Sequence, residues 1–200
     1  MVAYRSTERV KARLTASRER IVAAAIGILA DHGYAGCSVA AVAARAGVAT
    51  GSVYRHFPAK ADLFAEVFRS AGQREIDAVT RAAAAESTAA ARVRAVIETF
   101  AGRALRSPRL AYALLAEPVD PAVEAQRLVF RRAHAALLAG YIADGVADGE
   151  LPAQNPELTS TAVVGALAEA MVGPLASGVA GPDTVGGLIT FIHRALGVPS

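Results

Sequence analysis

The sequence predicts an all-α protein with a small N-terminal three-helix domain and a larger helical C-terminal domain. Hydrophobic residues make up 54% of the chain but aromatic residues only 6%, so alanine dominates, and alanine is the strongest helix former. Apolar residues recur at spacings of three and four, which is typical of helices with one buried face. Glycine and proline cluster at a few sites, so the helices between them can be long.

Residues 1–16 are basic and show no sustained apolar period, so we expect a flexible arm there. Such an arm could follow phosphates or enter the minor groove of DNA. The alternative is a solvated tail, because basic tails are common.

A compact domain is predicted over residues 17–62. Ser17 is placed to cap the first helix, and Gly33 suits the left-handed residue after its end. Ser38 can cap the second helix, and Gly47 supplies the turn that follows it.

The third helix of this domain is short, with Thr50 as its expected N-cap and Pro58 ending it. Val53 and Phe57 are four residues apart and should face inward. Small residues at a helix N-terminus let the backbone approach base edges, while Tyr and His suit phosphate oxygens. The expected polar face consists of Thr50, Gly51, Ser52, Tyr54 and His56.

Four pieces in this region occur in the order and spacing of one known family. They are the segment R-E-R-I-V-A-A-A-I-G-I-L-A-D-H-G-Y, the segment S-V-A-A-V-A-A-R-A-G-V, the motif Y-x-H-F-P-x-K, and a long helix opened by Lys60. From about Ser17 to Phe68 the chain therefore resembles the N-terminal domain of TetR-family bacterial transcriptional regulators. The resemblance implies a helix-turn-helix domain followed by a ligand-binding and dimerisation domain over residues 63–200.

The resemblance also implies which residues contact DNA. Thr50, Gly51 and Ser52 would lie near bases, and Tyr54 and His56 match phosphate contacts. Alternatives remain: Thr50 could act only as a cap, Tyr54 could be buried, and Arg55 could be a solvated charge. The full predicted DNA-binding set is Ser38, Thr50, Gly51, Ser52, Tyr54, Arg55, His56 and Lys60.

Three positions depart from the family pattern. Ala40 and Ala41 stand where many relatives carry a long polar side chain, so base readout from the second helix is not expected. Cys37 stands where threonine is common, and we interpret it as a small structural residue; redox sensing is the alternative.

Charge is distributed unevenly along the chain. Residues 1–60 carry nine Lys or Arg and three acids, a net charge of +6, whereas residues 61–200 have a net charge of −3. A basic N-terminal end is the electrostatic pattern of a DNA-binding surface.

The rest of the chain is expected to be helical, and its last two helices carry more apolar surface than a monomer needs. TetR-like proteins dimerise through these helices, and a reader of twofold DNA sites needs a second copy. The alternative is that the apolar stripes only close the monomer core. Helices are expected over residues 60–83, 88–106, a short segment from 108, 121–147, 156–173 and 183–196. The predicted interface residues are Val164, Leu167, Met171, Leu175, Val185, Leu188, Ile189 and Ile192.

An effector pocket is expected among the middle helices, at residues that interrupt apolar stripes. His134 lies on an otherwise apolar face, although a core histidine bonded to a neighbour is the alternative. Arg127 could pair with an acid instead of a ligand. The predicted pocket residues are Phe100, Arg103, Tyr112, Glu117, Arg127, Phe130, His134 and Tyr141.

The sequence argues against an enzyme, since no nucleophile, nucleotide-binding or dinucleotide motif is present, and no cofactor is expected. The histidines lack metal-ligand spacing, so no metal site is expected. We expect no membrane span and no secretory signal, and the single cysteine fits the cytoplasm.

These observations together predict a homodimeric, sequence-specific transcriptional regulator, a repressor released from a palindromic operator by a small apolar or amphipathic effector. The alternative is a helical, architectural protein that binds DNA without sequence preference.

Overall fold

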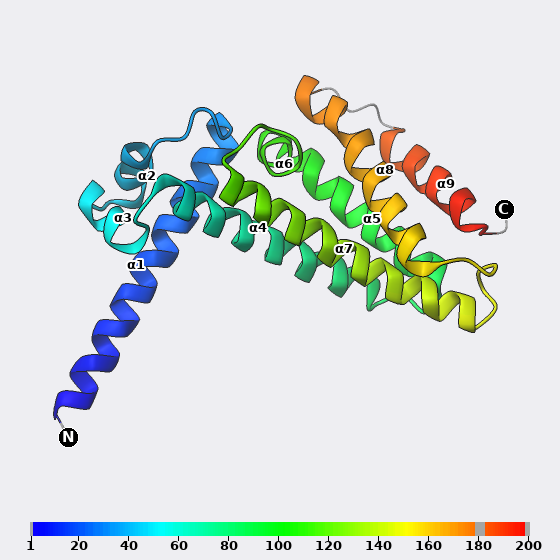
Figure 1. Ribbon diagram of the computed structural model, residues 1–200, viewed down its shortest axis with the longest axis horizontal. Helices are drawn as coiled ribbons and strands as arrows, with labels where there is room; N and C mark the ends of the chain where they lie inside the picture. Colours follow the sequence, from blue (N-terminus) through cyan, green and yellow to red (C-terminus); the bar gives the residue numbers. More distant parts are fainter. Residues whose placement is uncertain (1, 179–182, 199–200) are drawn as a thin grey trace.

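The computed structural model describes residues 2–178 and 183–198, and these residues form an all-α fold without strands (Figure 1). Met1 of the expected arm, and residues 179–182 and 199–200 of the expected C-terminal domain, lie outside them. The helices of the described part are α1 (Val2–His32), α2 (Val39–Ala46), α3 (Thr50–His56), α4 (Lys60–Ala83), α5 (Ala89–Arg106), α6 (Pro108–Leu115), α7 (Pro121–Ala147), α8 (Pro156–Ser177) and α9 (Thr184–Leu196).

The first helix is longer than the sequence predicted. α1 begins at Val2, so the expected start at Ser17 is wrong, and its N-terminal half projects away from the other helices (Figure 1). This half of α1 packs against no other helix of the described part, which agrees with the absence of an apolar stripe in its sequence. Residues 11–16 are all exposed. Polar, charged and alanine residues still favour helix there, so a helix forms without a buried face.

The turn chemistry of the N-terminal domain is mostly as predicted. Gly33 and Gly47 both have positive φ, at 68° and 64°, which suits glycine at helix ends. The Ser38 hydroxyl oxygen accepts a hydrogen bond from the Ala41 amide at 3.1 Å. The cap predicted at Thr50 is wrong, because Ala49 is the N-cap and Thr50 is the first helical residue.

Helix α4 joins the two ends of the molecule and belongs to both cores. Leu63, Phe64, Val67 and Phe68 pack with α1–α3, so the N-terminal core extends beyond the boundary expected at residue 62. Farther along, α4 packs beside α5 and α7 (Figure 1). A displacement along α4 would therefore be felt at both ends.

Helices α8 and α9 form the outer layer of the C-terminal part (Figure 1). α8 continues for one turn past Pro174, although the sequence predicted its end there. By length and mean hydropathy α8 is the one helix in the described part that could cross a membrane, which is weak evidence alone. It packs on α6 and α7, and a third of its most apolar window is buried.

Candidate DNA-binding surface and effector cavity

The polar face of α3 is available for contact. Thr50, Gly51 and Arg55 are exposed, and Tyr54 retains 48% of its surface, so the alternative of a buried Tyr54 is wrong. Val53 and Phe57 are buried as predicted and fix this helix against the domain core. The side chains that the core does not use therefore point outward from a rigid support.

A basic groove of about 560 Å³ runs between α3 and the N-terminal half of α1. Arg13 and Arg20 line it from α1, facing Ser52, Arg55 and His56 of α3. Neither arginine of α1 was among the predicted DNA-binding residues: Arg13 precedes the helix start expected at Ser17, and Arg20 lies within the expected helix but was assigned no DNA contact. Their seven-residue spacing, about two helical turns, was the available signal.

Lys60 is half-buried, and its ammonium group lies over aromatic rings of the domain. Its Nζ lies 4.9 Å from the centroid of the Tyr34 ring and 5.7 Å from that of Phe64. These contacts are cation–π interactions on the inner side of the domain. Ser38, by contrast, is exposed at the start of α2, where a phosphate could also reach.

Cys37 is buried beneath the same region. Its Sγ lies 3.0 Å from the Gly33 carbonyl oxygen. Burial raises the pKa of the thiol to about 11, so the thiolate needed for redox chemistry is disfavoured. The structural interpretation of Cys37 is the one that the geometry supports.

A cavity of about 190 Å³ opens between α4, α5, α6 and α7. Three of the predicted pocket residues line it, namely Phe100, Arg103 and Phe130. Glu75 of α4 also lines it, with one carboxylate oxygen accepting from Arg103 Nε at 2.6 Å. The sequence analysis missed Glu75, because a lone acid on a charged helix face carries no local signal.

A second, smaller hollow of about 20 Å³ shares the walls Phe100, Leu115 and Phe130 with this cavity. His134 lines it and is only 4% exposed. His134 Nδ1 lies 3.2 Å from the Phe130 carbonyl oxygen, while Nε2 is buried without a partner among the described residues. Burial lowers the pKa of His134, which favours the neutral ring.

The other four predicted pocket residues do not line either hollow. Tyr112 packs against the C-terminal core, and Tyr141 receives the Arg92 guanidinium over its ring at 5.8 Å. Arg127 and Glu117 have structural partners, described next. A break in an apolar stripe can therefore also arise where a polar side chain satisfies buried backbone groups.

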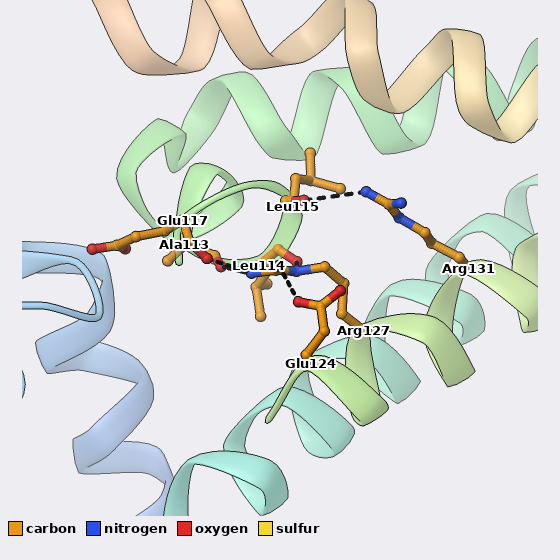
Figure 2. Close-up of polar contacts among 7 residues, drawn as sticks. All are labelled: Ala113, Leu114, Leu115, Glu117, Glu124, Arg127 and Arg131. Atoms are coloured by element: carbon orange, nitrogen blue, oxygen red, sulfur yellow. Dashed lines mark hydrogen bonds and ion pairs between the residues drawn. The ribbon is translucent and has the colours of Figure 1, made fainter. Parts of the chain in front are cut away.

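Arg127 fastens the end of α6 to α7 (Figure 2). Its guanidinium donates to the carbonyl oxygens of Leu114 at 2.9 Å, Ala113 at 3.1 Å and Glu117 at 2.7 Å, and pairs with the Glu124 carboxylate. The last carbonyls of a helix have no partner within the helix, so a buried cation there satisfies them.

Glu117 points the opposite way, toward α1 (Figure 2). Its carboxylate accepts from the backbone amides of Tyr34 at 2.7 Å and Ala35 at 3.0 Å, in the turn after α1. Nearby, the Tyr34 hydroxyl donates to Asp120, which precedes α7. The segment between α6 and α7 is therefore bonded to the N-terminal domain on one side and to Arg127 of α7 on the other.

The predicted dimer interface lies only partly at the protomer surface. Five of its members are buried within the protomer's own core: Leu167, Met171, Leu175, Leu188 and Ile192. Val164, Val185 and Ile189 are only half-buried. Larger apolar side chains are exposed on the same helices, with Leu158 at 69% and Phe191 at 57%. The sequence showed which helices are apolar, but their inward and outward faces were confused because both are rich in small residues.

The N-terminal segment is similar in sequence to known regulatory proteins. Residues 21–67 match the family described as bacterial regulatory proteins, tetR family. Over 56 residues the chain is 39% identical to the HTH-type transcriptional regulator CymR of Pseudomonas putida, a match that covers 28% of each protein.

Solved structures resemble the whole fold. The regulator FadR of Bacillus subtilis, in complex with stearoyl-CoA, has a TM-score of 0.78 at 19% identity, covering 91% of this chain and 99% of FadR. RolR in complex with resorcinol has a TM-score of 0.73 at 18% identity, covering 94% of this chain and 90% of RolR. At these identities the likeness concerns the fold.

Proposed function

We propose that this chain, whose residues 21–67 match the tetR family of bacterial regulatory proteins, is a cytoplasmic repressor. It would bind a palindromic operator as a homodimer and leave it when a small effector binds. The observation that carries this proposal is the exposed polar face of α3 beside a groove lined by Arg13, Arg20 and Arg55. Small side chains at the start of α3 suit base edges, and the arginines suit phosphates.

Dimerisation is supported by the outer face of α8 and α9. Leu158 and Phe191 are exposed there, and a Cβ added at Gly165 or Gly186 would meet nothing within 4 Å. Small residues with open space above them permit close approach of helices from a second copy. In the dimer, two α3 helices would enter successive major grooves about 34–36 Å apart.

Effector control is supported by the cavity between α4 and α7 and by the bonds that connect its walls with the N-terminal domain. FadR and RolR, which share this fold, were solved with small-molecule ligands. An effector that binds better to a conformation with the wrong α3 separation would release the dimer from DNA. Helix α4 would carry the change, because it contributes to both cores.

The proposal is tested by selecting binding sites from random duplex DNA at about 150 mM salt, without ligand, for the wild type, Ser52→Ala and Tyr54→Phe. We expect one enriched palindrome, bound about 10³-fold or more tightly than random DNA. Ser52→Ala should change the selected bases, whereas Tyr54→Phe should weaken binding to all sequences alike. Tyr141→Phe, the same change far from α3, is the matched control.

An architectural, non-specific DNA-binding protein is the competing function, and the same basic groove favours it. It predicts binding that rises at low salt without any enriched sequence. That result would overturn the proposal that the protein is a sequence-specific repressor.

A further inference from the structure

Two buried polar atoms in the cavity walls have no partner among the described residues: Oε1 of Glu75 and Nε2 of His134. Buried polar groups almost always have hydrogen-bond partners, so each needs an explanation. The residues that carry these atoms line adjoining hollows, which share Phe100, Leu115 and Phe130 as walls. A single molecule in these hollows could reach both.

The chemistry that His134 requires follows from its other nitrogen. Nδ1 faces the Phe130 carbonyl oxygen, which can only accept, so Nδ1 carries the proton. In the neutral ring Nε2 is then an acceptor and needs a donor from the ligand. The hollow beside it measures about 20 Å³, close to the space that one water-sized group needs.

Glu75, in the wall of the larger cavity, also requires a hydrogen-bond donor from the ligand. Its Oε2 is engaged by Arg103, and the unpaired Oε1 would repel a carboxylate placed against it. Because Arg103 is already paired, the other cations at the two hollows are Arg106 and Arg131, and both are exposed to solvent. An anionic head group therefore gains little here compared with a donor.

The size and walls of the main cavity define the rest of the ligand. Apolar cavities of about 150 Å³ bind benzene, so about 190 Å³ holds one substituted ring. Phe100 and Phe130 supply aromatic surface, and both rings contact the His134 ring edge-on, with centroids 5.8 and 4.3 Å away.

We propose that the cavity binds a neutral single-ring aromatic compound whose hydroxyl group donates to His134 Nε2, with Glu75 Oε1 available to a second donor. The inference deepens the proposed effector control and depends on it for its regulatory role. Binding itself is independent of DNA.

The test is calorimetric titration of the full chain with 3-methylphenol and with 1,3-dimethylbenzene, in which a methyl group replaces the hydroxyl. We expect 3-methylphenol to bind about tenfold or more tightly, although burial alone favours the hydrocarbon. His134→Leu should erase or reverse this preference. His193→Leu should retain it, since His193 also has a buried, unpartnered Nε2 but lines neither hollow.

Three results would overturn the inference: no measurable binding of 3-methylphenol, an unchanged preference in His134→Leu, or tighter binding of 3-methylbenzoate, which would indicate an acid-binding site. A ligand-induced rise in the melting temperature of the wild type that is absent in His134→Leu would support it. The selection of DNA sites described above contains no ligand. A failed titration would therefore not contradict the proposed DNA-binding function, and a failed selection would not affect the interpretation of the titration.

Discussion

Arg127 and His134 lie on the same helix, seven residues apart, and both are almost fully buried, yet their surroundings differ. All the polar neighbours of Arg127 are arranged around it, with three carbonyl oxygens and one carboxylate. His134 has one backbone partner and one unpartnered nitrogen beside a hollow. A buried polar group with every bond satisfied is typical of structure, whereas one left open at a cavity indicates a ligand. Arg127 thus lies where α7 holds the end of α6, and His134 lies where α7 borders a hollow.

The largest expected effect comes from removing the guanidinium of Arg127, whose hydrogen-bond partners surround it. Arg127→Met should lower the free energy of unfolding by about 3–5 kcal/mol, because three carbonyl oxygens at the end of α6 lose their buried donor. Denaturant unfolding measures the change. Arg132→Met, an exposed position on the same helix, should change stability by less than about 0.5 kcal/mol. Equal losses in the two variants would contradict the role of Arg127.

The next effect concerns the hydrogen bonds that join Glu117, between α6 and α7, to the N-terminal domain. Glu117→Ala leaves the amides of Tyr34 and Ala35 without their acceptor and should cost about 1–3 kcal/mol. Operator affinity should also become less sensitive to effector, since a link between the two domains is lost. Unfolding and DNA binding, each measured with and without 3-methylphenol, check both parts. Unchanged sensitivity would show that the signal travels by another path.

The cavity wall offers a smaller and sharper test. A Cβ on Gly72 of α4 would lie 2.8 Å from Phe130 Cδ2, so Gly72→Ala should push the ring out of its place. Overpacking costs about 1–3 kcal/mol, partly offset by about 1 kcal/mol from the better helix former. Binding of 3-methylphenol should weaken as well. Gly140→Ala on α7, where a Cβ meets nothing within 4 Å, should be neutral or stabilising and should leave binding intact.

The smallest effect is the pH dependence that His134 imposes. Burial lowers the pKa of His134 below the ordinary 6.5, so its imidazole binds a proton more readily in the unfolded chain than in the folded one. The stability of the wild type should therefore fall as pH drops below about 6.5. His134→Leu should flatten that part of the profile and keep the protein folded, because it replaces an unpartnered polar group with an apolar one. A steeper profile in the variant would contradict this assignment.

The helices themselves were largely predictable because local rules decide them. Gly33 and Gly47 end helices in the left-handed region, Ser38 caps α2, and the spacing of Val53 and Phe57 buries one face of α3. The start of α1 was not, since the rule for locating helices relies on an apolar stripe. A helix that projects from the molecule buries nothing and has no stripe to show.

The sequence by itself determined the all-α fold class, the family of the N-terminal domain and the polar face of α3, because these depend on residues close together in the chain. Tertiary structure decided which polar residues of the C-terminal part line the cavity. Arg103 and Glu75 meet across 28 residues, and Arg127 reaches carbonyls on another helix. It also decided that Leu167 and Met171 face inward. The physical reason is that both faces of α8 are apolar, so only packing against α6 and α7 selects the buried one.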